Sequence, residues 1–175
     1  GKSSIFNILT RKNVNITHKE SGTTRDWHKE EIYLTNNIYI YDTPGLILNS
    51  SNEDEINSKA ILEELILQSH VLLLVIDFQS KLNPQDQSIL NWLRIFDKEI
   101  ILLVNKRDNL KKIISDYYEF GINNIFFLSC AHKLGFDKFR QYLNDNIQSK
   151  YDNIKLFNSK INHSIAIFGK PNSGK

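Results

Sequence analysis

Residues 165–175 read Ile-Ala-Ile-Phe-Gly-Lys-Pro-Asn-Ser-Gly-Lys, and the rest of the chain is organised around this stretch. Its four leading apolar residues predict a strand buried on both faces. Gly169, Gly174 and Lys175 then fit the pattern Gly-x-x-x-x-Gly-Lys, in which backbone N–H groups and a lysine surround phosphates. The chain also opens on Gly-Lys-Ser-Ser at positions 1–4, which matches the end of the same pattern. Two partial phosphate-binding loops therefore flank the remaining sequence.

The composition indicates one globular domain. The chain has 175 residues, of which 41% are hydrophobic and 24% charged, and its net charge of +2 is too small to indicate a nucleic-acid partner by itself. A single cysteine excludes an intrachain disulfide and favours a reducing, cytoplasmic setting. No apolar run approaches the roughly 20 residues that span a bilayer, so we expect no membrane association. Because the chain starts within a motif and contains no Met, we expect a fragment.

Hydrophobic periodicity predicts alternating strands and helices. Apolar residues recur at helical spacing in 3–12, 53–68, 84–96, 110–120 and 136–147. A β-hairpin is predicted within 30–41, and buried strands at 70–76, 99–104, 125–128 and 164–168. This alternation predicts a three-layer α/β/α fold with a mostly parallel sheet, to which the hairpin adds one antiparallel edge strand.

We expect a division into 1–147, a domain that lacks its first strand, 148–163, a linker, and 164–175, the first strand and loop of a second domain. An empty slot between buried strands would leave backbone groups unpaired, which is costly. The linker can extend over on the order of 50 Å, more than a domain of this size requires. We therefore hypothesise that 164–168 fills the vacant slot.

Two further motifs follow predicted strands, where ligands collect in α/β sheets. In Asp-Thr-Pro-Gly at 42–45, Asp42 can hold the water shell of a metal ion and the Gly45 N–H can sense a terminal phosphate; a simple turn is the alternative. In Asn-Lys-Arg-Asp at 105–108, the carboxylate of Asp108 can accept two hydrogen bonds from guanine. Asn105 can tie the loop together, and the aliphatic stem of Lys106 can lie along the base.

Ser129 and Cys130 end the next predicted strand, where their backbone N–H groups could face the guanine oxygen. The alternative is a plain strand terminus. Cys130 is better interpreted as a small packed residue than as a nucleophile, because no partner base is evident.

Taken in order, these motifs, with Gly-Thr-Thr-Arg-Asp at 22–26 between the first two, resemble the P-loop GTPases of the translation-factor type. More narrowly, the chain resembles the group that contains Era, MnmE and Der. A phosphate loop downstream of a first GTPase domain is similar to the tandem arrangement of the Der family. The resemblance implies a P-loop NTPase-type fold and GTP hydrolysis as a switch in assembly of the large ribosomal subunit. It also implies contact with ribosomal RNA and a monomeric state.

Carried over by position, the resemblance assigns nucleotide and Mg²⁺ contacts. It assigns a phosphate contact to Lys2. It assigns Mg²⁺ contacts to Ser3, Thr24 and Asp42, and catalytic roles to Thr24 and Gly45. The choice between Thr23 and Thr24 stays open. The residues expected to bind nucleotide are Lys2, Ser3, Asp42, Gly45, Asn105, Lys106, Asp108, Ser129, Cys130, Gly169, Asn172, Gly174 and Lys175.

Leu46 follows Asp-Thr-Pro-Gly, where Ras-like enzymes carry a glutamine that orients the attacking water. Leucine has no hydrogen-bonding side chain, so it cannot do this. The resemblance instead suggests a potassium ion with the loop asparagine, here Asn172, as a ligand. We expect hydrolysis by the intact protein to be faster in K⁺ than in Na⁺, and equal turnover in the two salts would contradict this.

Two alternatives remain at this point. The GTPase domain of an MnmE-like tRNA-modification protein fits Gly-Thr-Thr-Arg-Asp equally well but does not account for the second phosphate loop. A non-catalytic fragment that binds GTP poorly would follow from the missing front of the first loop.

Overall fold

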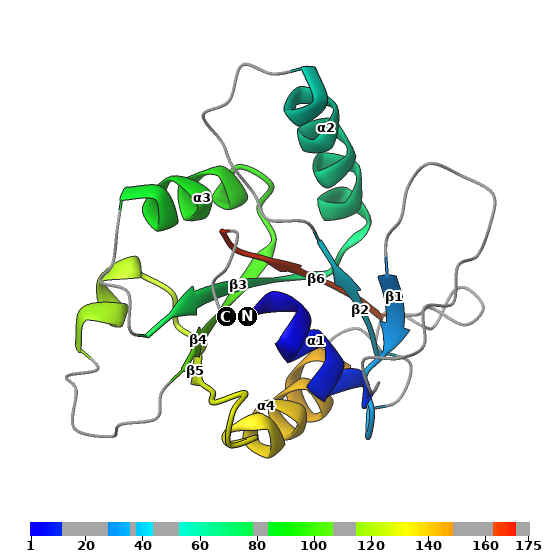
Figure 1. Ribbon diagram of the computed structural model, residues 1–175, viewed down its shortest axis with the longest axis vertical. Coiled ribbons are helices and arrows are strands. Elements are labelled where there is room, and N and C mark those ends of the chain that lie inside the picture. Colours follow the sequence, from blue (N-terminus) through cyan, green and yellow to red (C-terminus); the bar gives the residue numbers. More distant parts are fainter. Residues whose placement is uncertain are drawn as a thin grey trace.

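The computed structural model describes residues 1–11, 28–35, 38–43, 53–78, 84–106, 115–148 and 163–170. Within these residues, six strands form one sheet in the order β1-β2-β6-β3-β4-β5 (Figure 1). The strands are β1 (His28–Glu31), β2 (Ile38–Asp42), β3 (Val71–Asp77), β4 (Glu99–Asn105), β5 (Ile125–Phe127) and β6 (His163–Phe168). The helices are α1 (Lys2–Thr10), α2 (Glu53–Gln68), α3 (Pro84–Arg94) and α4 (Phe136–Tyr142), with a 3-10 helix η1 (Ser115–Phe120) and a π-helix η2 (Leu143–Gln148).

Five of the six strands run parallel. β2 pairs in parallel with β6, β6 with β3, β3 with β4, and β4 with β5. Only β1 is antiparallel, paired with β2 from His28 opposite Asp42 to Glu31 opposite Tyr39. The predicted fold, a mostly parallel α/β sheet with an antiparallel edge strand from a hairpin, is confirmed.

The central strands alternate between two hydrophobic cores because successive side chains of a strand point to opposite faces. On β3, Leu72, Leu74 and Ile76 face one core, whereas Val71, Leu73 and Val75 face the other. Helices α2 and α3 and η1 cover the first face, and α1, α4 and η2 cover the second (Figure 1). All seven residues of β3 are buried, which explains the unbroken apolar run in the sequence.

β6 lies in the middle of the sheet although it comes last in the described sequence. Ile165 is level with Ile40 of β2 on one side and with Val71 of β3 on the other. All six of its residues are buried. The backbone of both neighbouring strands is therefore paired at this position, as parallel ladders require.

The observed elements differ from the predicted ones mainly at their ends. Of the helix predicted at 110–120, the structure describes only the 3-10 turn η1, and residues 107–114 lie outside the described residues. The helix predicted at 136–147 changes to π-helical geometry at Leu143. β3 begins one residue later and ends one residue later than predicted, and its last residue is Asp77. No helix within the described ranges is both long and apolar enough to cross a membrane.

Candidate functional site

Polar residues gather at one edge of the sheet. Because β2, β6, β3, β4 and β5 are parallel, their carboxyl ends meet at the same edge, which is where α/β proteins bind ligands. Asp42 and Asp77 end β2 and β3, Asn105 ends β4, and Gly169 follows β6. Parallel strands therefore bring together residues that are far apart in the sequence.

Lys2 joins the start of α1 to the segment after β6. Its ammonium group, Nζ, donates to the carbonyl oxygen of Gly169 at 3.1 Å and to that of Lys170 at 3.3 Å. Burial lowers the pKa of Lys2, and the negative charge of Asp42 opposes this shift. The two partial loops thus meet: the glycine that begins one and the lysine that ends the other are in contact.

Ser3 lies in the first turn of α1 and is exposed. The first N–H groups of an α-helix have no partners within the helix and carry partial positive charge. A hydroxyl beside a buried ammonium and those N–H groups suits a ligand that carries phosphate and a hard metal ion.

Thr43 links the end of β2 to β6 through a side-chain hydrogen bond. Its hydroxyl, Oγ1, donates to the carbonyl oxygen of Ile167 at 2.5 Å, and the residue is only 4% exposed. The Asp-Thr-Pro-Gly segment therefore starts against the strand that leads into the phosphate loop.

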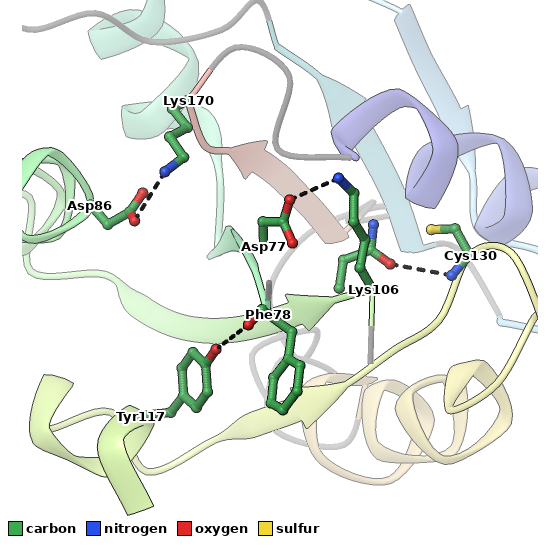
Figure 2. A network of polar contacts seen from close by, with 8 residues as sticks. Asp77, Phe78, Asp86, Lys106, Tyr117, Cys130 and Lys170 are labelled. Carbon is green, nitrogen blue, oxygen red and sulfur yellow. Dashed lines mark hydrogen bonds and ion pairs between the residues drawn. The ribbon is translucent and has the colours of Figure 1, made fainter. Parts of the chain in front are cut away.

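Asn105 ties the end of β4 to the turn after β5. Its side-chain oxygen, Oδ1, accepts the backbone N–H of Cys130 at 3.2 Å, as Figure 2 shows, and the side chain is almost fully buried. Ser129 pairs with Leu134 through both backbone groups, which closes that turn. Asn105 therefore couples the two segments predicted to surround guanine.

An ion pair fixes the residue after Asn105. The Lys106 ammonium lies 2.8 Å from a carboxylate oxygen of Asp77, and both side chains are largely buried (Figure 2). Lys106 has a φ of 65°, in the left-handed region, so its backbone turns sharply as it leaves β4. The pairing holds the charged end of Lys106 against β3.

A second ion pair links the phosphate-loop segment to α3. Lys170 Nζ lies 3.4 Å from a carboxylate oxygen of Asp86, whose side chain is 1% exposed (Figure 2). Asp86 lies in the first turn of α3, where a carboxylate is favoured by the helix dipole.

The Cys130 thiol is not arranged for nucleophilic chemistry. Burial raises its pKa to about 11, because removal from water disfavours the thiolate. The thiol is therefore protonated near neutral pH, and the backbone N–H of Cys130 makes the contact with Asn105.

The described candidate residues occur at the carboxyl edge, but part of the predicted site lies outside the described residues. The predicted residues at this edge are Lys2, Ser3, Asp42, Asn105, Lys106, Ser129, Cys130 and Gly169. Those outside the described residues are Thr24, Gly45, Asp108, Asn172, Gly174 and Lys175.

Sequence reasoning missed four residues of this edge: Thr43, Asp77, Asp86 and Lys170. Asp77 could have been found, since a carboxylate directly after a buried apolar run marks the carboxyl end of a parallel strand. Asp86 and Lys170, which pair with each other, are 84 positions apart, and no local sequence pattern predicts such a contact.

Comparison with known proteins identifies the family. A family model described as "50S ribosome-binding GTPase" matches residues 1–106, more than half of the chain. The chain belongs to the 50S ribosome-binding GTPase family. The resemblance predicted from the motifs is confirmed.

Similar proteins include several named GTPase Der. The chain is 35% identical to GTPase Der of Thermoanaerobacter pseudethanolicus over 181 residues and 31% identical to that of Aquifex aeolicus over 183 residues. Each alignment covers 100% of this chain and 40% of the relative, so the chain spans about 40% of the length of these curated relatives. Among solved structures, a probable GTP-binding protein engB has the same fold, with a TM-score of 0.60 and 22% identity over 85% of this chain and 93% of that chain.

Proposed function

We propose that this chain binds GTP at the carboxyl edge of its sheet and hydrolyses it to GDP and phosphate. The observation that carries the proposal is the position of Lys2, which reaches the backbone of Gly169 and Lys170. Among the described residues, the Lys2 ammonium donates to these two carbonyl oxygens, and the charge of Asp42 balances its positive charge in part. Phosphate oxygens can replace those carbonyls and balance it more strongly, because charge-assisted hydrogen bonds are the stronger kind.

Selection of guanine is proposed to depend on the segment after β4. Asn105 holds this segment against Cys130, and Asp77 holds Lys106. With both anchors in place, the carboxylate of Asp108 is proposed to accept the two N–H donors of guanine, while Ser129 and Cys130 face the guanine oxygen. Adenine does not offer that pair of donors.

Mg²⁺ is the proposed metal. Ser3 in the first turn of α1 and Asp42 at the end of β2 supply oxygen atoms, the donors that Mg²⁺ prefers, and Thr24 is proposed as a further ligand. When bound, the ion neutralises charge on the phosphates. K⁺, with Asn172 as a ligand, is proposed to supply the positive charge that an arginine finger supplies in other GTPases, since Leu46 cannot orient the attacking water as a Ras-like glutamine does.

The proposed biological role is a switch in assembly of the large ribosomal subunit in the cytoplasm, with ribosomal RNA as partner and a monomeric state. Its support is the description of the matching family and the similarity to GTPase Der. The phosphate-loop pattern at 169–175 supports the proposal that residues 164–175 begin a second GTPase domain.

The test is nucleotide binding by the 175-residue chain and by Lys2→Ala. We expect GTP to bind more tightly than ATP in the presence of Mg²⁺. Loss of a hydrogen bond to a charged group costs about 1.5 to 3 kcal/mol, so Lys2→Ala should weaken GTP binding roughly 10- to 150-fold. Titration with a fluorescent GTP analogue measures both.

Lys98→Ala is the matched control, because Lys98 is a half-buried lysine whose ammonium donates to the carbonyl oxygen of Leu67 of α2, away from this edge. Thermal unfolding of all three proteins shows whether Lys2→Ala still folds. Equal affinity of the chain and Lys2→Ala for GTP, or equal affinity of the chain for GTP and ATP, would contradict the proposal.

A further inference from the structure

Residues of α1, of α4 and of the turn before α4 line a groove. Helices α1 and α4 cover the same face of the sheet (Figure 1). The groove has a volume of about 650 Å³, within the range of about 300–1,000 Å³ typical of ligand sites. Residues that line it include Ile8, Arg11, Lys133, Phe136, Asp137 and Arg140. None of them is among the residues expected to bind nucleotide, so this groove is separate from the proposed GTP site.

The lining of the groove is strongly positive. Its side chains include three cations, Arg11, Lys133 and Arg140, and one carboxylate, Asp137, which leaves a formal charge of +2. The Asp137 side chain is fully exposed, so water screens its pairing with Arg140 at 3.3 Å. The positive charge of the groove is therefore not compensated from within.

Arg140 is held rigidly at the groove. One terminal nitrogen, Nη2, donates to the carbonyl oxygen of Ile8 at 2.8 Å and so fixes α4 to α1. Only 12% of the side chain is exposed. Its Nε is buried and has no hydrogen-bond partner among the residues that the structure describes. Burial lowers the pKa of Arg140; the charge of Asp137 opposes this shift, and the nearby charge of Arg11 adds to it.

Arg11 is also positioned by a neighbour. Its guanidinium carbon lies 3.4 Å from the centre of the Tyr33 ring, a cation–π contact that orients the planar group. Lys133 is exposed and approaches the groove from the turn before α4. One pre-positioned guanidinium, one buried guanidinium and one exposed ammonium thus converge on a groove that also contains apolar Ile8 and Phe136.

We propose that this groove binds phosphate groups of an RNA backbone. The forked donors of two arginines match phosphate oxygens, and a lysine adds a point charge of the same sign. The choice of RNA over another anion rests on the proposed ribosomal role, because a partner rich in RNA presents phosphates to any positive groove on this surface. Binding here would orient the GTPase domain without using the nucleotide edge.

The experiment measures binding of a short RNA hairpin to the full 175-residue chain, saturated with GDP, by fluorescence anisotropy over a range of salt concentrations. The variants are Arg11→Asn and Lys133→Asn. Both positions have positive φ, 55° and 53°, and asparagine tolerates that backbone while removing the charge. Each variant should bind RNA several-fold more weakly and lower the slope of log affinity against log salt by about one.

Lys138→Gln is the matched control, since Lys138 is an exposed lysine of α4 that does not line the groove. It should leave affinity and slope unchanged. Equal losses in all three variants, or no loss in Arg11→Asn and Lys133→Asn, would overturn the proposal. Displacement of the RNA by inorganic pyrophosphate at equal phosphate concentration would indicate a site for free phosphate compounds instead. Displacement by polyglutamate would indicate an acidic protein partner, and either result also overturns it.

GTP affinity of the same variants separates this proposal from the proposed function. Arg11→Asn and Lys133→Asn should bind GTP as the unmodified chain does. RNA binding that depends on the groove in a chain unable to bind GTP would leave the groove proposal standing and refute the nucleotide proposal. GTP binding with no groove-dependent RNA binding would refute the groove proposal and leave the nucleotide proposal standing.

Discussion

His70 occupies the junction between α2 and β3, beside the first residues of β6. Its Nδ1 accepts the backbone N–H of Ser164 at 3.1 Å, while the Ser164 hydroxyl donates to the carbonyl oxygen of Gln68 at 2.7 Å. An imidazole nitrogen that accepts a hydrogen bond carries no proton, so the native structure favours neutral His70. The ring of His163 lies nearby, with 5.8 Å between ring centroids.

This arrangement predicts that stability falls in mild acid. Burial, then the charges of His163 and Lys98, lower the pKa of His70 from the ordinary value of about 6.5. The unfolded chain therefore takes up a proton at this position before the folded chain does. The contribution is complete above about pH 6.5 and is lost as pH falls below it toward the lowered pKa. Urea unfolding midpoints between pH 7.5 and pH 5.5 measure the effect.

His70→Asn should reduce this pH dependence, since the asparagine oxygen can accept the Ser164 N–H without titrating in that range. His132→Asn is the control, because His132 is an exposed histidine in the turn after β5. It should retain the pH dependence of the unmodified chain. An unchanged slope in His70→Asn would show that other groups cause the effect.

Individual site residues were predictable where a motif follows a strand, but their contacts were not. Asn105 was expected to tie its loop together, and its side chain does bond to the N–H of Cys130. Lys106 was expected to lie along the base through its stem. Its ammonium pairs with Asp77, a contact between β3 and β4 that depends on strand register rather than on local sequence.

At the scale of elements, β6 is enclosed on both faces and along both edges. Its side chains alternate between both cores: Ala166 and Phe168 face α2 and α3, and Ile165 and Ile167 face α1 and α4. Its backbone pairs on both sides. All six residues of β6 are buried, so truncation of an apolar side chain here should be costly.

The variant Ile167→Ala tests how much the burial of β6 contributes to stability. Ile167 is fully buried, and the loss of its side chain should lower the free energy of unfolding by about 2 to 5 kcal/mol through lost apolar burial and the cavity left behind. Leu67→Ala is the control, because Leu67 of α2 is 66% exposed and its truncation should change stability by less than about 0.5 kcal/mol. Chemical denaturation measures both. A similarly small loss of unfolding free energy in both variants would mean that β6 is not tightly packed in the core.

Element type followed from periodicity, whereas element geometry did not. Unbroken apolar runs predicted β3 and β4, because strands buried on both faces need apolar side chains in both directions. The change from α- to π-helix at Leu143 was not predictable. The apolar residues Leu143 and Ile147 still have helical spacing, and the backbone adjusts to seat them in the core.

At the scale of the whole molecule, the sheet is completed by a segment remote from its neighbours. Residues 163–168 separate β2 from β3, and Lys2 contacts the backbone 167 positions away at Gly169. The sheet and the proposed phosphate-binding edge therefore depend on the same strand, β6.

Removal of residues 163–175 should consequently abolish both cooperative folding and GTP binding. The truncated chain would expose unpaired edges of β2 and β3 and lose the buried side chains of β6, which also favours aggregation. Circular dichroism during thermal unfolding and the fluorescent GTP titration measure the two effects. A synthetic peptide of 163–175 should restore them in part. A truncated chain that melts cooperatively at the original temperature would show that the slot can close without β6.

The sequence by itself determined the class of fold, the order of strands and helices and the family, because hydrophobic periodicity and short motifs are local properties of the chain. The sequence also led to the hypothesis that residues 164–168 fill a vacant slot in the sheet. Only the tertiary structure decided that this strand lies between β2 and β3, which carboxylates pair with Lys106 and Lys170, and where the basic groove forms. Those features depend on contacts between residues distant in sequence, and such contacts exist only after the sheet has set the register of its strands.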